Sequence, residues 1–597
     1  MSSSPRKTVK ARFSHAWARM FSTSVFARFV SLYERANARL RDGLFHRANL
    51  LSLSGKRRVL RLKGAAARQI DESFLAVFWK RCVHFLLSLR VRCVGLFFFV
   101  FGVINCLIYL SSRFLPRFLT ADPKHLIFGV FITLASLPLF RRRRSLAASL
   151  KQSRLLSAFL EKAVLLRENE FPTLHAQSAD AFCILSGLIL GLLSLFFNPF
   201  RLLGVLLMLI FVALAFYKPE FGAAALLFLF PFLSQTASAN LLIFLFAALM
   251  LKVLRGKRTL RFELIGLSAG IFSAFLLLCG LFSILPANQN ASLLFVGALS
   301  FFLVSNLSGR REVFTVLLAL FVLGATASSV MRLGFHFLPD SLFTGGARLL
   351  LRTLTDHASL YFTLCALPLA LLFSIRGESA LGRLFFFTCL FALLADLWLY
   401  ASLAAALTAL ACTALLLAVS SRKMFLLVLV LALATLVALP LIEGAQTEFL
   451  WTALSERSPS IFVNQSRLPQ GSFLFGIGAF SPEALTALNL SDSLSGSLTF
   501  YSQFLLAVGI FGLLVFLLFL LFAMQKSTHY YLTSPYNPKR LFAIAPLFSI
   551  LALLIIGLTR NLFADARAFS LIFVFAAALS SLTQTLSRED NVILDRF

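Results

Sequence analysis

The chain has 597 residues, of which 59% are hydrophobic and only 14% charged, and its mean hydropathy is +0.87. A soluble domain carries about 25% charged residues, and a single core stops growing near roughly 250–300 residues, so this composition excludes a water-soluble globular protein. The apolar residues come in continuous runs long enough to cross about 30 Å of hydrocarbon as helices, without the alternating segments of β-barrels. We predict an all-α polytopic membrane protein with about 14–16 transmembrane helices.

The net charge of +31 is concentrated in residues 1–93 and 141–167. Nucleic-acid binding is one interpretation of such basicity. The other is retention on the cytoplasmic face beside anionic lipid headgroups, which we favour because both stretches flank predicted spans. Residues 1–40 have the Arg- and Ser-rich composition of a mitochondrial transit peptide or of surface-lying amphipathic helices. The first true apolar run starts near Val94, so we predict no secretory signal.

The cysteines form no CxxC pair, and most of them lie inside apolar runs. This argues against a disulfide framework or a thiolate metal site. The sequence also lacks a P-loop, a dinucleotide-binding fingerprint, an HExxH helix and a GxSxG elbow. We therefore predict no cofactor, no metal and no nucleic-acid partner.

Hydropathy and run length predict about sixteen membrane-crossing helices. Their ranges are 94–110, 126–140, 181–197, 202–217, 221–236, 240–254, 263–279, 291–306, 313–331, 357–375, 384–400, 402–420, 424–442, 501–523, 541–559 and 565–584. The segment 221–236 is the weakest, because it is short and contains Pro231.

Charge bias predicts which ends of the spans face the cytoplasm. The arginines 141–144 fix the end of the second span inside. With the N-terminus inside, the basic clusters of the later loops also fall inside, namely 252–261, 310–311, 376–383, 422–423 and 526–540. Both termini are then cytoplasmic, and the two long connections 332–356 and 443–500 are external.

This layout predicts a basic cytoplasmic region 1–93, a two-helix membrane hairpin 94–140, a basic cytoplasmic linker 141–180 and a membrane domain 181–597 with the large external loop 443–500. An amphipathic helix is expected over 155–166 within the linker. A single large external loop is expected to serve function. No internal repeat is visible, so an inverted-repeat transporter has no positive support.

Two segments of the C-terminal half carry a family resemblance. The external loop contains Gly476, Gly478 and Phe480, and the next span contains Phe504, Gly509, Gly512, Leu513 and Phe516. Earlier, Arg348 and Arg352 precede Asp356-His357-Ala358, and the span continues through Pro368-Leu369-Ala370. In order, spacing and sidedness these segments resemble the O-antigen ligase and O-antigen polymerase superfamily of membrane glycosyltransferases. The resemblance covers residues 200–585 and leaves out the first two spans.

The chain departs from this family at two places. No histidine occurs in 443–500, where many ligases carry a His-containing element before the re-entering span. The SRG turn of the family reads Tyr400-Ala-Ser-Leu here, without an arginine.

The resemblance implies that a glycan is transferred or polymerised from an undecaprenyl-diphosphate carrier at the outer face of a bacterial plasma (inner) membrane, without a metal. Guanidinium groups suit a diphosphate leaving group because they bind it bidentately and stabilise developing charge. The predicted catalytic residues are Arg457, Arg467 and, as general base, His357. The predicted substrate-binding residues are Arg348, Arg352, Asp356, Asp396, Gly476 and Gly478.

Each of these assignments has a plainer alternative. The arginines are otherwise solvated loop residues or headgroup contacts, and His357 a polar residue at a span end. Asp396 lies within an apolar run near its predicted outer end, where an ionisable residue is costly and suggests function. It is otherwise an interfacial residue beside Trp398 and Tyr400. For the whole protein, a transporter or flippase of lipid-linked sugars and a non-catalytic scaffold remain alternatives.

Overall fold

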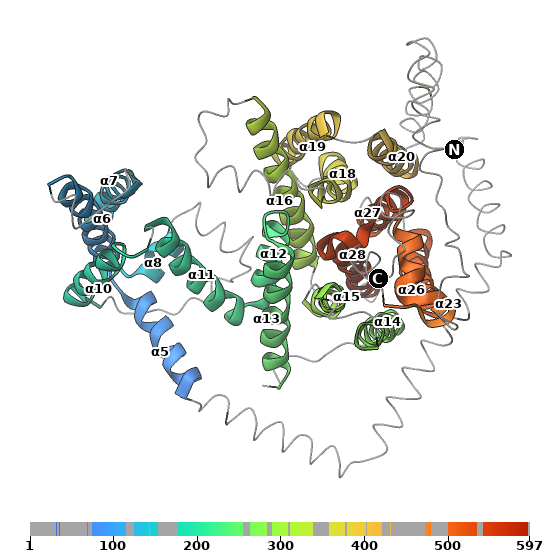
Figure 1. Cartoon of the computed structure of the whole chain (residues 1–597), viewed down its shortest axis with the longest axis horizontal. Coiled ribbons are helices and arrows are strands. Elements are labelled where there is room, and N and C mark those ends of the chain that lie inside the picture. Colours follow the sequence, from blue (N-terminus) through green and yellow to red (C-terminus); the bar gives the residue numbers. More distant parts are fainter. Residues whose placement is uncertain are drawn as a thin grey trace, which may run out of the picture. The chain divides into compact units, whose positions relative to one another are not determined.

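In the computed structural model, helices form nearly all of the described residues (Figure 1). The described ranges are 74–114, 124–141, 144–152, 177–197, 199–254, 263–282, 289–307, 311–337, 358–376, 379–400, 403–420, 472–478, 499–533 and 541–594, together with a few single positions. Within these ranges no β-strand occurs, and only two isolated bridges pair extended residues. The fold is therefore all-α, as predicted.

The main helices follow the apolar runs of the sequence. Their bounds are α5 Phe74–Ser88, α6 Val91–Phe114, α7 Lys124–Ser136, α8 Leu146–Gln152, α10 Asp180–Leu193, α11 Pro199–Tyr217, α12 Pro219–Leu229, α13 Gln235–Leu254, α14 Leu264–Leu281, α15 Gln289–Leu307, α16 Arg311–Phe337, α18 Ala358–Arg376, α19 Ala380–Tyr400, α20 Leu403–Ser420, α23 Ser472–Phe475, α26 Phe500–Thr533, α27 Leu541–Ile556 and α28 Ala566–Leu594. Short 3₁₀ turns follow α7, as η2 Leu137–Arg141, and precede α28, as η7 Leu562–Ala564.

Six helices of the described part are long and apolar enough to cross a membrane, within α6, α13, α14, α16, α19 and α26. Further apolar helices of 10–17 residues accompany them, among them parts of α10, α15, α18, α27 and α28. Since a span needs about 17–25 apolar residues, the protein is a polytopic membrane protein. The predicted span 424–442 and the predicted helix over 155–166 lie outside the described residues.

Large apolar side chains remain exposed along the helices, where a bilayer would cover them. On α19 the side chains of Leu384, Phe391 and Trp398 are exposed at a spacing of seven residues, which places them on one face. The opposite face of α19 is buried against the protein and includes Leu393 and Asp396. The exposed apolar face of α19 is therefore the face that contacts lipid.

Contacts divide the chain into two units, each described by itself. Unit 1 includes 225–247 and 259–597, and unit 2 includes 61–224 and 248–258. Helices α10 and α11 therefore group with α6 and α7, whereas the sequence prediction joined residues 181–224 to the C-terminal membrane domain.

Unit 2 is held together by close contact between helix backbones. A Cβ added to Gly129 on α7 would lie 2.8 Å from the carbonyl oxygen of Gly102 on α6, and one added to Gly187 on α10 would lie 2.7 Å from the carbonyl oxygen of Phe97. Glycine is required where two helices approach this closely in a membrane. The Cys93 thiol of α6 adds a polar contact, because it donates to the Asp180 carboxylate at 3.0 Å.

Unit 1 is built around phenylalanine. Rings from α14, α26, η7 and α28 stack on one another, and Phe272 on α14 alone contacts Phe504, Phe516, Phe569 and Phe573. Phe272, Phe504 and Phe516 are fully buried. Aromatic pairs contribute about 0.5–1.5 kcal/mol beyond the area that they bury, so this cluster is the main packing core of the unit.

Two helices of unit 1 contain an internal proline, Pro368 in α18 and Pro546 in α27. A proline inside a helix removes one backbone donor and weakens the bonds of the preceding turn. In both helices a serine from a neighbouring helix donates to the carbonyl three residues before the proline. Ser549 donates to Cys365 O at 2.8 Å, and Ser527 donates to Ala543 O at 2.5 Å. These carbonyls lie in the turn that each proline weakens, and the serine hydroxyls give them a donor from a neighbouring helix where no water is at hand.

Candidate functional site: the polar end of unit 1

Helix α26 is broken near its start. Gly509 has φ 67° and ψ −173°, which is not helical, so Phe500–Val508 and Ile510–Thr533 are separate segments. The ring centroids of Phe504 and Phe516 are only 4.9 Å apart, whereas twelve residues of straight helix span about 18 Å. The first segment therefore folds back against the second. The predicted single span 501–523 is in fact two helical segments, and only the second is long enough to cross the bilayer.

The Gly-Ile-Gly segment 476–478 docks on this break. Ile477 N donates to Leu506 O at 2.8 Å and Gly478 N to Ala507 O at 3.1 Å. These carbonyls precede Gly509 and would otherwise lose partners at the break. Gly476 and Gly478 both have positive φ, and a Cβ on Gly476 would stand 2.5 Å from Ala507 O. The three glycines thus permit a compact junction, which we call the glycine junction (Gly476–Gly478 with Leu506–Gly509).

A polar layer lies beside the first segment of α26. Phe500 N donates to Gly557 O at 3.1 Å, which ties the start of α26 to the end of α27. The Asn561 side-chain amide donates to Gln503 Oε1, and Gln503 is fully buried. The Tyr361 hydroxyl on α18 donates to Asn561 O at 3.5 Å. Through these hydrogen bonds the first segment of α26, which forms part of the glycine junction, is linked to the first turn of α18.

A buried ion pair joins α16 and α19. The Arg332 guanidinium bonds to Asp396 Oδ2, and the two side chains are 3% and 1% exposed. Asp396 Oδ2 also accepts from Ser329 and Thr363, both at 3.0 Å. Arg332 Nη1 donates to Ser359 Oγ at 2.6 Å. Charges inside a span are costly, which makes this cluster the first candidate for a functional group.

The ring of Tyr400 completes the cluster. The centre of the Arg332 guanidinium lies 5.6 Å from the Tyr400 ring centroid, a cation–π distance. The Tyr400 hydroxyl donates to Arg332 O at 3.2 Å. Tyr400 is the last residue of α19, so the guanidinium beside this helix end is supplied by another helix, α16.

A second arginine–carboxylate pair caps α28 at the same polar layer. Arg567 Nε and Nη2 bond both oxygens of Asp565 at 2.6–3.1 Å, and Asp565 also accepts from Arg567 N. Arg567 Nη1 donates to Leu233 O in the turn between α12 and α13. Its guanidinium stands 5.8 Å from the Phe362 ring centroid. These contacts are all made to other groups of the protein, so the pair anchors the turn between α12 and α13 to α28.

A third pair marks the opposite end of the helices. Lys526 on α26 bonds to Glu263, which directly precedes α14, and Ser580 on α28 donates to the same carboxylate oxygen at 3.2 Å. The contacts thus gather the start of α14 with the later parts of α26 and α28. The ends of α16 and α19 meet the start of α18 at the other end. The helix ends that meet in each group are those that charge bias predicts to lie on the same side of the membrane.

The structure describes three of the predicted site residues. Asp396 is buried in the ion pair with Arg332. Gly476 and Gly478 shape the backbone of the glycine junction, where Gly478 N is already bonded to Ala507 O. The other predicted site residues, Arg348, Arg352, Asp356, His357, Arg457 and Arg467, lie outside the described residues.

Arg332 was not predicted from the sequence. It was counted as the first residue of an external connection because the apolar run ends at Met331, whereas α16 continues to Phe337. A signal was present, since Thr326, Ser329 and Arg332 recur every three residues. This spacing places a polar stripe on one helix face and extends the helical period past the apolar run.

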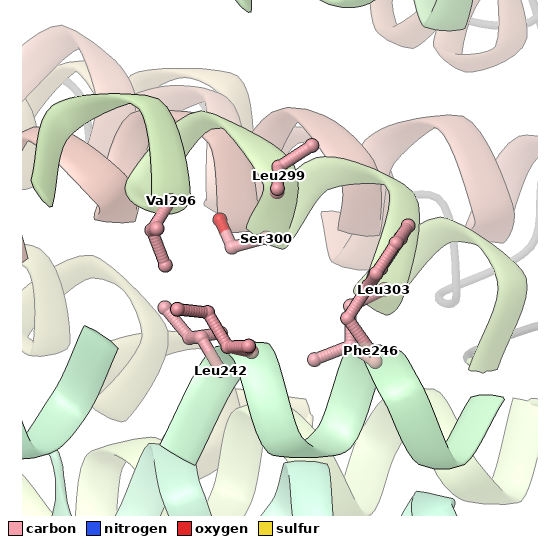
Figure 2. Close-up of a pocket in the computed structure, with 7 residues that line it drawn as sticks. Leu242, Phe246, Val296, Leu299, Ser300 and Leu303 are labelled. Carbon is pink, nitrogen blue, oxygen red and sulfur yellow. The ribbon is translucent and has the colours of Figure 1, made fainter. Parts of the chain in front are cut away.

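A small apolar pocket lies between α13 and α15. Leu242, Phe246, Val296, Leu299 and Leu303 surround it, and Ser300 is the polar residue of the lining (Figure 2). The Ser300 hydroxyl donates to Ser570 O at 3.4 Å. The lining offers no charged group, so the pocket has no means of recognising a phosphate.

Among the described residues no group of three or more His, Cys, Asp or Glu side chains gathers to hold a metal ion. No protein-family model matches the chain, and neither a curated protein nor a solved structure matches it. The fold and its buried charges therefore define the class, an all-α polytopic membrane protein with a polar, partly non-helical end.

Proposed function

We propose that this protein is a membrane glycosyltransferase of bacterial cell-surface polysaccharide assembly. It would transfer or polymerise glycan from an undecaprenyl-diphosphate carrier at the outer face of the plasma membrane. The observation that carries the proposal is the glycine junction. Three motif glycines from segments more than thirty residues apart, Gly476, Gly478 and Gly509, meet in one backbone arrangement at the predicted external end.

The proposed reaction needs an acceptor hydroxyl, a base and a site for the leaving diphosphate. The hydroxyl oxygen attacks the anomeric carbon of the carrier-linked glycan, a glycosidic bond forms, and the bond to the carrier phosphate breaks. His357, beside Asp356, takes the hydroxyl proton. Arg457 and Arg467 stabilise the charge on the departing undecaprenyl diphosphate.

The remaining arginines and the basic N-terminus have binding roles in this proposal. Arg348 and Arg352 hold the carrier diphosphate bidentately before transfer. Residues 1–93 bind anionic headgroups on the cytoplasmic side. The exposed apolar helix faces support contact with membrane lipid, since they would otherwise be open to water.

The proposal is tested by lipid-linked glycan in a deletion strain. We expect undecaprenyl-linked glycan to accumulate without the protein and to be cleared when the wild-type chain is added back. The Arg457→Ala/Arg467→Ala variant should reach the membrane in normal amount and fail to clear the pool. A strain without accumulation, or full clearance by the double variant, would show that the chain is not a transferase acting through this loop.

A transporter or flippase of lipid-linked sugars is the second candidate, and two observations favour it. Transporters build their sites from discontinuous helices and intramembrane charges, and this chain has both, at Gly509 and at Arg332–Asp396. Proteoliposomes loaded with lipid-linked glycan separate the candidates. Movement of the lipid between leaflets without a new glycosidic bond would favour the transporter.

A further inference from the structure

Three segments of unit 2 cross at the start of α6. Arg90 N donates to Gln177 O at 3.1 Å, and Val91 N donates to Arg144 O at 3.0 Å. These hydrogen bonds hold the start of α6 beside the segment that precedes α8 and the segment that precedes α10. We call this crossing the arginine junction (residues 88–91, 144–146 and 177).

The crossing gathers four arginines from two segments of the chain. Arg90 and Arg92 flank the first residue of α6, and Arg144 lies on the segment that is bonded to it. Arg141 ends η2, which packs against α6 at Gly95. The side chains of Arg92, Arg141 and Arg144 are exposed. Residues that are about fifty positions apart in the sequence thus place positive charge around one end of α6.

The charge of these arginines is not balanced within the described part of the chain. There, their side chains form no ion pair and no hydrogen bond. Arg90 Nε is buried without a hydrogen-bond partner, and a buried donor without a partner costs free energy. The Asp180 carboxylate at the start of α10 accepts instead from the Cys93 thiol. Because like charges brought together repel one another, the arginine junction favours the binding of an anion.

We propose that the arginine junction binds the phosphate of an anionic phospholipid on the cytoplasmic side of the membrane. Guanidinium groups bind phosphate bidentately, and charge bias predicts that this end of α6 faces the cytoplasm, where the leaflet carries anionic lipids. Exposed apolar side chains continue beside the junction, at Leu137 on η2 and at Phe182 on α10, which lies against Phe85 of α5. They offer a surface to the acyl chains, which favours a lipid over free phosphate or a nucleic acid.

This site differs from a general attraction of residues 1–93 to the membrane surface. Arg141 and Arg144 lie outside that region, and a backbone hydrogen bond fixes Arg144 next to the start of α6. A built site depends on the planar fork of the guanidinium group, whereas a general attraction depends only on charge. The inference shares with the proposed function only the anionic lipid as a partner, and it does not depend on glycan transfer.

The test measures lipid binding to the purified full chain in neutral detergent by native mass spectrometry. The probe is dioctanoyl phosphatidylglycerol, and dioctanoyl phosphatidylcholine is the zwitterionic comparison. Arg90→Gln/Arg144→Gln removes two charges from the junction, and Arg90→Lys/Arg144→Lys keeps the charges without the guanidinium forks. The control Arg376→Gln/Arg383→Gln removes two charges at the ends of α18 and α19 that are also predicted to face the cytoplasm.

We expect the wild type to bind phosphatidylglycerol more tightly than phosphatidylcholine, and Arg90→Gln/Arg144→Gln to lose about tenfold in affinity for phosphatidylglycerol. The control should stay within about twofold of the wild type, and the lysine variant should lie between the two. Wild-type affinity in Arg90→Gln/Arg144→Gln, or an equal loss in the control, would overturn the site. Wild-type affinity in the lysine variant would also overturn it, because charge alone would then explain the binding.

Two competitors test whether the occupant is a lipid. Inorganic phosphate and a short oligonucleotide, each at the concentration of the phosphatidylglycerol, are expected to leave its binding unchanged. Displacement of the lipid by either would overturn the lipid assignment. If Arg90→Gln/Arg144→Gln does not fold, Arg144→Gln is compared with Arg383→Gln, since both side chains are exposed, and equal affinities would overturn the site. No glycan enters this experiment, so it can fail while the proposed function holds, and the reverse.

Discussion

The two units of this protein pack their helices by different means. In unit 2 the helices α6, α7 and α10 touch backbone to backbone at glycines such as Gly102, Gly129 and Gly187. In unit 1 Gly324 on α16 also meets the backbone of Phe228 on α12, but many of the helices pack through phenylalanine rings and are linked by buried ion pairs. Glycine contacts place no charge in the membrane, whereas the ion pairs of unit 1 do.

This difference indicates where function is to be sought. Helix association in lipid needs only close packing and a few hydrogen bonds, and unit 2 supplies both without a buried arginine–carboxylate pair in its described part. The described part of unit 1 contains two such pairs, a broken helix and two proline-containing helices. We therefore assign the candidate chemistry to unit 1 and a packing role to unit 2.

The largest effect is expected from breaking the Arg332–Asp396 pair on one side only. Asp396→Leu leaves the Arg332 charge buried without its carboxylate, which should destabilise unit 1 by about 3–5 kcal/mol. Thermal unfolding in detergent, followed by loss of the monodisperse peak, measures this. The double variant Arg332→Met/Asp396→Leu should recover most of the loss, and a failure to recover would mean that the charges are needed for folding.

A smaller effect is expected from filling the glycine contacts of unit 2. A Cβ on Gly129 would lie 2.7 Å from the Cys106 sulfur and 2.8 Å from Gly102 O, so Gly129→Ala should cost about 1–3 kcal/mol by overpacking. Gly204→Ala on α11 is the matched control, because its Cβ would meet nothing within 4 Å. The control should be neutral or slightly stabilising, since alanine favours helix. Equal melting temperatures for both variants would contradict the close packing.

The serine bonds at the two prolines are expected to contribute about 1 kcal/mol each. Ser549→Ala removes the donor to Cys365 O, and Ser527→Ala removes the donor to Ala543 O. Each variant should lower the melting temperature by a few degrees without changing glycan clearance. An unchanged melting temperature in Ser549→Ala or Ser527→Ala would show that the serine bond contributes nothing to stability.

The smallest effect is expected at Tyr400. Tyr400→Phe keeps the ring beside the Arg332 guanidinium and removes only the hydroxyl that donates to Arg332 O at 3.2 Å. Because Tyr400 is partly exposed, the loss should be about 0.5 kcal/mol. Tyr400→Leu also removes the ring and should cost more. Equal losses in the two variants would show that the cation–π contact contributes nothing.

The helices themselves were predictable because hydropathy is a local property. Long apolar runs must form helices in a bilayer, so the predicted ranges 94–110, 291–306 and 384–400 fall within α6, α15 and α19. The ends were less predictable. Helix α16 continues past its apolar run to Phe337, because Arg332 finds its partners inside the protein and not in water.

The candidate site was predictable only in part. Asp396 stood out because a carboxylate within an apolar run is unusual, and the glycines stood out through their spacing. The residues that Asp396 and Gly478 contact were not predictable. Asp396 bonds to an arginine 64 residues away, and Gly478 in the external loop bonds to Ala507 in the following helix. Contacts at such sequence separations depend on how helices pack, which a local pattern does not contain.

The amino-acid sequence by itself determined that this is an all-α polytopic membrane protein, where most of its helices run and which loops carry the positive charge. These properties follow from run length and charge, each read residue by residue along the chain. Only the tertiary structure decided that α26 folds back at Gly509, that segment 476–478 fills the break, and that Arg332 is paired with Asp396. The reason is that buried polar groups must find partners, and in a membrane those partners come from other helices.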